Sequence, residues 1–191
     1  MDAYRKLMDR ADTWYRSVQS AHSAKVPCRI GCRDCCLGLF EISLADRDML
    51  REGLAKLSEV ERLEIRNRAG SILNQLRRTY PDLGESLRGL SEEEIDEILA
   101  IPGDVECPAL GPGGECRLYD HRPLVCRLAG VPVVDLRGQA VQPEGCVHCT
   151  LTPGETPPID HTSLRAQEML ILRERYGKRA DETLTIPQGL A

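Results

Sequence analysis

The sequence predicts a mainly α-helical fold, a single domain with a small irregular α+β region. Three observations lead to this fold class. The first two are that apolar residues recur at helical spacing in several segments and that capping signals stand before these segments. The third is the stretch from residue 101 to 160, where prolines, glycines and cysteines indicate turns and short pieces. The chain has 191 residues, which fits one domain.

The helices are predicted as follows. Residues 2–22 carry an apolar stripe at three-and-four spacing, which indicates a face turned toward the core rather than a cofactor site. Three serines, each followed three residues later by an acidic residue, mark the starts of helices that end near residues 57, 80 and 99. A last helix is expected over about 162–176. The serine pairs are Ser43 with Asp46, Ser58 with Glu61 and Ser91 with Glu94. The expected buried residues are Tyr4, Leu7, Met8, Ala11, Trp14, Tyr15 and Val18 in the first helix, and Val60, Leu63, Ala69, Ile72, Leu73 and Leu76 in the third.

The remaining segments are predicted to be short or irregular. Residues 37–42 and 131–136 are expected to be strands, and residues 122–128 to form one or two helical turns. The tail over residues 181–191 is expected to be irregular.

Charge and hydropathy exclude two classes of partner. The formal net charge is -5, whereas non-specific nucleic-acid binding depends on an excess of Lys and Arg. No apolar run approaches the roughly 20 residues that span a bilayer, so no membrane segment is expected. The N-terminal segment is charged throughout and resembles no secretory signal, which predicts a cytoplasmic protein.

Nine cysteines are the most informative feature of the composition. A disulfide framework would not persist in a reducing cytosol, and an odd count fits closed pairing poorly. Inert thiols would not cluster as these do, so the clusters predict metal binding. In this interpretation, metal–thiolate bonds cross-link the irregular region. The predicted ligands are Cys28, Cys32, Cys35 and Cys36 in the first stretch, residues 28–36, and Cys107, Cys116, Cys126, Cys146 and Cys149 in the second, residues 107–149.

The first stretch suits a metal-binding loop. Spacings of two and three residues bring several thiolates together at little cost in loop closure. Arg29 and Arg33 can lower the thiol pKa values and offset negative charge, or they can be ordinary surface arginines. Because neighbouring side chains of an extended segment point to opposite sides, either one of Cys35 and Cys36 is not a ligand or the two serve different centres. The spacing of the first three cysteines also matches that of radical SAM enzymes, which supports an iron–sulfur site.

The motif CxxxCxxCC, followed by CPxL and then CxxYxxRPxxCR, resembles the YkgJ-like cysteine-cluster family, described as a zinc- or iron-chelating domain. The resemblance covers residues 28–36 and 107–127 and makes residues 58–100 a helical insertion into a single metal-binding domain. It implies metal or cluster binding. A similar pattern in flagellin lysine N-methylases, larger proteins that bind an iron–sulfur cluster, favours iron–sulfur over zinc. Besides seven cysteines, the residues in register are Pro108, Leu110, Tyr119, Arg122, Pro123 and Arg127.

Several residues near the motif have alternative interpretations. Tyr119 can pack over the site or belong to the core, and Arg122 can pair with Asp120 or with cluster sulfur. His121 is expected to be structural, whereas His148 is an alternative metal ligand. The residues expected beside the metal or cluster are Arg29, Arg33, Tyr119, Arg122 and Arg127.

Two further expectations concern the second stretch. Gly111 and Gly114 should form a turn that returns Cys116 toward Cys107, and the two cysteine stretches should meet in space, because neither offers a complete site alone. Cys146 and Cys149 form a CxxC that could complete a site begun by Cys107, Cys116 and Cys126.

The irregular spacing favours a [4Fe–4S] cluster, with zinc as the alternative. The predicted function is a metal-binding protein with a redox, sensing or metal-handling role. The alternatives are a cluster-dependent enzyme, of SAM type or protein-modifying, and a zinc-stapled adaptor that docks a protein partner.

Overall fold

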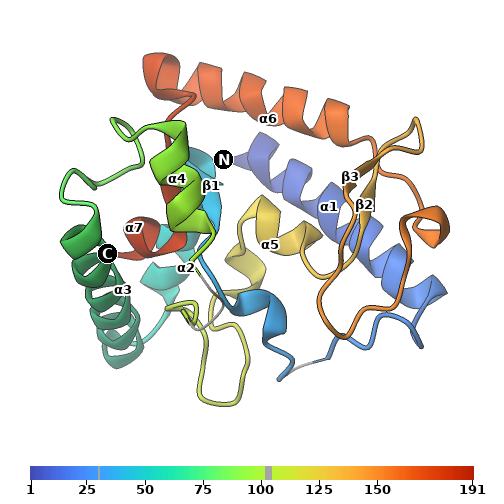
Figure 1. The fold of residues 1–191 in the computed structure, drawn as a ribbon, viewed down its shortest axis with the longest axis horizontal. Coiled ribbons are helices and arrows are strands. Elements are labelled where there is room, and N and C mark those ends of the chain that lie inside the picture. Colours follow the sequence, from blue (N-terminus) through green and yellow to red (C-terminus); the bar gives the residue numbers. More distant parts are fainter. Residues whose placement is uncertain (30, 102–104) are drawn as a thin grey trace. The chain divides into compact units, whose positions relative to one another are not determined.

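The computed structural model describes residues 1–29, 31–101 and 105–191 (Figure 1). Within these residues helices dominate, and the strands form only two two-stranded sheets, so the predicted mainly α fold class with a small α+β part is confirmed. Ile30, inside the first cysteine stretch, and residues 102–104, inside the predicted irregular stretch, lie outside the described residues. No helix in the described part is long and apolar enough to cross a membrane.

The chain folds into two compact units, each built from distant parts of the sequence. Unit 1 comprises Met1–Cys35 and Leu124–Ala180, and unit 2 comprises Cys36–Pro123 and Asp181–Ala191. The first boundary between the two units lies between Cys35 and Cys36, the adjacent cysteines that we call the vicinal pair. Whether residues 58–100 are an insertion stays a prediction.

Unit 1 is organised around the helix α1 (Asp2–Ala21), which packs against α5 (Leu124–Leu128) and α6 (His161–Tyr176) (Figure 1). The Tyr4 hydroxyl donates to Glu168 of α6 at 3.1 Å, and the Trp14 indole donates to the Pro157 carbonyl at 2.9 Å. The predicted apolar stripe is confirmed for six of its members, which are buried: Tyr4, Leu7, Met8, Ala11, Trp14 and Val18.

The smaller elements of unit 1 follow α5. The strand predicted over 131–136 is confined to β2 (Val133–Val134), which pairs antiparallel with β3 (Ala140–Gln142). A 3₁₀ turn, η3 (Pro153–Glu155), precedes α6, and another, η4 (Gly177–Arg179), follows it.

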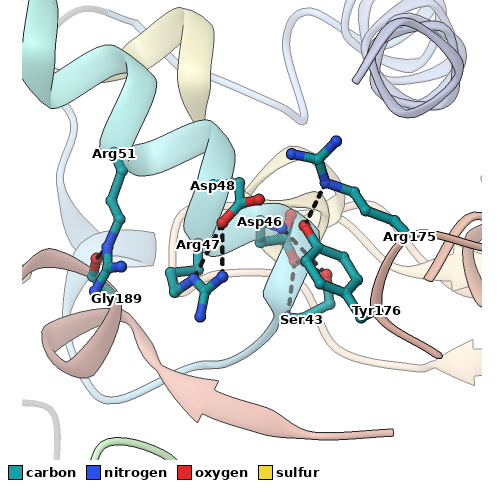
Figure 2. A network of polar contacts seen from close by, with 8 residues as sticks. All are labelled: Ser43, Asp46, Arg47, Asp48, Arg51, Arg175, Tyr176 and Gly189. Atoms are coloured by element: carbon teal, nitrogen blue, oxygen red, sulfur yellow. Dashed lines mark hydrogen bonds and ion pairs between the residues drawn. The ribbon is translucent and has the colours of Figure 1, made fainter. Parts of the chain in front are cut away.

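Unit 2 contains three helices that begin with the predicted capping boxes: α2 (Leu44–Lys56), α3 (Glu59–Thr79) and α4 (Glu92–Leu99). Figure 2 shows one of them, in which the Ser43 hydroxyl accepts from the Asp46 amide at 3.2 Å. A hydrophobic core of leucines and one isoleucine is formed by side chains of α3, of α4 and of the segments around them. Its buried members are Leu39, Leu73, Leu76, Leu83, Leu87 and Ile98.

The predicted buried side of α3 is wrong in its first turns. Val60 and Leu63 are 68% and 59% exposed, and Ile65 is buried instead. The reason is the helical period: a residue five positions from Ile65 falls well off the face that Ile65, Ala69 and Leu73 share.

The tail was expected to be irregular, and this is also wrong. It forms β4 (Thr183–Thr185) and α7 (Ile186–Leu190). β4 pairs antiparallel with β1 (Glu41–Ser43), the only part of the predicted 37–42 strand that forms a ladder. Thr185 and Gln188 make a capping box with Pro187 in the first turn, which suits a helix start. The Gly189 carbonyl then accepts from Arg51 of α2 at 3.2 Å (Figure 2).

Candidate metal centre

The end of α1 positions the first cysteine of the chain. The Gln19 amide donates to the Cys28 carbonyl at 2.8 Å, and the Tyr15 hydroxyl donates to the Cys28 sulfur at 2.9 Å. Val26 is buried just before this cysteine. The helix therefore holds both the backbone and the thiol of Cys28.

Three other thiols of unit 1 lie close enough to Cys28 to affect its pKa. Burial is the main cause that raises the pKa of Cys28, and the neighbouring charges of Cys146, Cys32 and Cys35 raise it further, whereas the Tyr15 hydrogen bond lowers it. The pKa of Tyr15 is raised as well, first by burial and then by Cys28, Cys35 and Cys146. We call Cys28, Cys32, Cys35 and Cys146 the Cys28 set.

The CxxC of the second stretch reaches this set through a turn. The Cys146 amide donates to the Gly130 carbonyl at 3.1 Å, and the Thr150 amide donates to the Lys25 carbonyl at 3.0 Å. The Nε2 of His148, the predicted alternative ligand, contacts the carboxylate of Asp34. The two cysteine stretches therefore lie beside each other as predicted, whereas a metal site shared between them stays a prediction.

Glycine allows this turn to pack closely. A Cβ on Gly145 would lie 2.8 Å from the Gly130 carbonyl oxygen and 2.9 Å from the Cys149 sulfur. Since real Cβ atoms do not approach so closely, the CxxC can lie against residue 130 only because residue 145 has no side chain.

The stretches also meet within unit 2. The Cys107 amide donates to the Cys36 carbonyl at 3.0 Å, and Leu37 forms an isolated antiparallel bridge with Glu106. In that register Cys36 and Cys107 stand opposite each other, and opposite residues of an antiparallel pair share one face.

The predicted turn that returns Cys116 toward Cys107 is confirmed. Leu110 bridges antiparallel to Cys116, and the Gly111 amide donates to the Glu115 carbonyl at 2.7 Å. Gly114 has φ 81°, a left-handed conformation that favours glycine. We call Cys36, Cys107 and Cys116 the Cys36 set.

The helix α3 fixes this hairpin from the side. Arg68 donates to the Leu110 carbonyl at 2.5 Å, and Arg117 forms an ion pair with Glu64 at 2.6 Å. Both contacts flank Cys116, so its position depends on the packing of α3.

The segment of the vicinal pair is not extended, contrary to the expectation. Asp34–Cys36 forms a 3₁₀ turn, η1. With about three residues per turn, successive side chains still point about 120° apart. Cys35 and Cys36 therefore diverge for a different reason than the one expected.

The arginines expected beside a metal differ in their surroundings. Arg29 and Arg33 are exposed, and their role stays a prediction. Arg127 is only 4% exposed and forms an ion pair with Asp12, which ties α5 to α1. The Arg122 guanidinium stacks 3.7 Å from the centre of the Tyr119 ring.

Tyr119 and His121 belong to a 3₁₀ turn, η2 (Tyr119–His121), which packs against α2. Tyr119 is 58% exposed. A Cβ on Gly53 of α2 would lie 2.7 Å from the His121 ring, and the His121 Nε2 is 2.9 Å from the Lys56 Nζ. This close packing supports the structural role expected for His121.

All nine cysteines are partly exposed and none forms a disulfide. Among the described residues, no three Cys, His, Asp or Glu side chains are already arranged as a metal-ligand group. The donor set nevertheless fits a thiolate-bound metal, because clustered soft sulfur ligands suit zinc and iron–sulfur centres. A groove of about 520 Å³ beside α2 and α3 has no cysteine in its lining.

Sequence reasoning missed Tyr15, which it assigned to the core stripe. The ring is partly buried, but the hydroxyl contacts the thiol 13 positions further along the chain. The available signal was its place at the edge of the stripe, where a tyrosine can bury its ring and present a polar end.

A family model matches residues 27–147, more than half of the chain. It is described as "CxxCxxCC: Putative zinc- or iron-chelating domain" and covers the first cysteine stretch and all of the second except its last two residues, His148 and Cys149, which confirms the resemblance inferred from the motifs. No curated protein and no solved structure matches the chain. The metal-chelating description of the family supports a metal-binding role. By the extent of this match, the chain belongs to the CxxCxxCC family.

Proposed function

We propose that this protein binds an iron–sulfur cluster through the Cys28 set and serves a redox, sensing or metal-handling role in the cytoplasm. The observation that supports the proposal is the packing of the CxxC turn beside the first cysteine stretch through backbone hydrogen bonds, which leaves Cys32, Cys35 and Cys146 near enough to Cys28 to raise its pKa. Thiolates are the ligand form for such clusters, and four of them complete the coordination of a [4Fe–4S] cluster. When bound, a cluster of this kind supplies one-electron chemistry.

The vicinal pair is divided between two ligand sets in this proposal. Cys35 belongs to the Cys28 set, while Cys36 stands opposite Cys107 in unit 2. Their side chains diverge because they occupy successive positions of a 3₁₀ turn. The Cys36 set is therefore proposed as the ligand group of a second centre.

The chain's other residues act on the thiolates by charge and position. Exposed Arg29 follows Cys28, and exposed Arg33 follows Cys32; both offset negative charge without adding a ligand. The contact of His148 with Asp34 holds the CxxC against the first stretch.

The test is elemental analysis of protein prepared without oxygen. Iron with acid-labile sulfide and a brown colour that bleaches in air support the proposal. A colourless protein with stoichiometric zinc supports the zinc-stapled adaptor instead. A protein that takes up neither metal when reconstituted without oxygen contradicts metal binding altogether.

Serine variants assign the ligands. Cys32→Ser should remove most of the metal of the Cys28 set, and Cys116→Ser should remove metal from the Cys36 set. We expect Cys126→Ser to have a similarly large effect, because Cys126 lies in the family motif. Cys149→Ser is the control and should cost less. Equal loss in all four variants would contradict the division into sets.

A further inference from the structure

The hydroxyl of Tyr15 is aimed at a sulfur atom. Its oxygen lies 2.9 Å from the Cys28 sulfur, with the hydroxyl as donor. The tyrosine comes from α1, before the stretch that the family model matches at residues 27–147. Its place therefore follows from the structure and not from the family motif.

Gly130 shapes the surroundings of this hydroxyl. Its φ is +93°, and a Cβ there would lie 3.7 Å from the Tyr15 hydroxyl oxygen. The carbonyl of the same glycine accepts from the Cys146 amide. One backbone position thus lies beside both the hydroxyl and a second cysteine of the Cys28 set.

A hydroxyl donor on a thiolate changes the properties of the centre that the thiolate holds. At neutral pH a tyrosine hydroxyl keeps its proton and can donate a hydrogen bond. A hydrogen bond to an ionised acceptor is stronger than a neutral one, and hydrogen bonds to ligand sulfur are among the factors that set cluster potentials. The donor stabilises the more negative, reduced state most, so it raises the reduction potential.

The comparison with Tyr4 separates this role from packing. Both tyrosines lie on α1, and each donates one hydrogen bond, but the Tyr4 hydroxyl donates to the Glu168 carboxylate of α6. Replacing Tyr4 by Phe removes a buried hydrogen bond of the same helix and leaves the donor to Cys28 in place.

We infer that Tyr15 is a positioning residue of the metal centre, whose hydroxyl hydrogen-bonds the Cys28 thiolate and sets the reduction potential of the bound cluster. This inference rests on the proposed function, because it concerns the same Cys28 set.

The test compares Tyr15→Phe with Tyr4→Phe in iron-loaded protein prepared without oxygen. A redox titration followed by absorbance and electron paramagnetic resonance should show a more negative potential for Tyr15→Phe. The expected shift corresponds to about a three- to tenfold lower ratio of reduced to oxidised cluster at a fixed applied potential. Tyr4→Phe should keep the wild-type potential even if it lowers the melting temperature.

A second variant keeps the aromatic ring and should shift the reduction potential in the opposite direction. Placing 3-fluorotyrosine at position 15 gives a more acidic phenol and a stronger donor, so the potential should move to more positive values. A merely structural role would not produce shifts of opposite direction. If the protein binds zinc instead, competition with a chelator should show about a three- to tenfold weaker zinc affinity for Tyr15→Phe.

The outcomes are distinguishable. Metal loading with the same potential or affinity in wild type, Tyr15→Phe and Tyr4→Phe overturns the role of Tyr15 and leaves the proposed function standing. A wild-type protein that binds no metal overturns the proposed function, and the inference falls with it.

Discussion

The ion pair between Asp12 and Arg127 predicts an unequal response to mutation. Arg127 lies on α5 with its side chain 3% exposed, whereas the Asp12 side chain on α1 is 26% exposed. Removing the aspartate takes away the carboxylate that pairs with a buried guanidinium. Removing the arginine leaves a carboxylate that water can reach.

The magnitudes follow from this difference in burial. Breaking a buried ion pair by removing one partner costs about 3–5 kcal/mol, and less where the remaining charge keeps other contacts or reaches water. We expect Asp12→Ala to cost about 3 kcal/mol of the free energy of unfolding. Arg127→Met keeps most of the side-chain volume and should cost about 1–2 kcal/mol, in the range of one lost hydrogen bond. Asp9→Ala, an exposed position of the same helix, should stay within about 0.5 kcal/mol.

The assay is urea denaturation at neutral pH without oxygen, with metal content measured for each variant. An Arg127→Met variant that loses more stability than Asp12→Ala would refute the reasoning from burial. Metal loss in Arg127→Met but not in Asp12→Ala would show instead that the arginine acts on the metal, as its place in the family motif implies.

Three further predictions concern other parts of the chain. Metal removal should raise hydrogen exchange in residues 105–160, because that segment has few periodic apolar residues that could replace the stabilising effect of the metal. The helix α1 should stay partly protected. Unchanged exchange would mean that the metal site contributes little to the fold. Burial, and next the charge of Arg165, lower the pKa of His161 in the folded state, so the unfolded chain binds a proton more readily. The urea midpoint of the wild type should therefore fall as the pH drops from about 7 through 6.5. His161→Gln should weaken this pH dependence, and an equal dependence of the midpoint on pH in the variant and the wild type would contradict the prediction. Thr185→Ala should cost about 1 kcal/mol by removing the cap of α7, and no change in urea midpoint would mean that the cap contributes nothing.

Local signals in the sequence were sufficient for the helices. The capping boxes at Ser43, Ser58 and Ser91 depend on residues three positions apart, so they can be found without knowing the fold. The same holds for the turn at Gly111 and Gly114. The tail was missed although Thr185 and Gln188 form the same kind of box, because a helix of five residues is too short to show a helical period in the sequence.

The strands could not be placed from local signals. β1 and β4 have three residues each and lie far apart in the sequence, so neither shows a period of its own. Their pairing becomes favourable only after the chain between them has folded. The exposure of Val60 and Leu63 is different, because the helical period alone places both well off the face that Ile65 shares with the rest of the buried side.

For the metal centre, the sequence by itself determined the kind of chemistry. The number, clustering and spacing of the cysteines indicate thiolate binding of a metal, and the family follows from residues fixed along the chain. Only the tertiary structure decided which cysteines share a neighbourhood. It associated Cys146 with Cys28 and placed Cys36 opposite Cys107, because backbone hydrogen bonds between distant segments set those registers. It also brought the Tyr15 hydroxyl to a thiol, a contact that no spacing in the sequence encodes, because it depends on how the loop after α1 folds back on the helix.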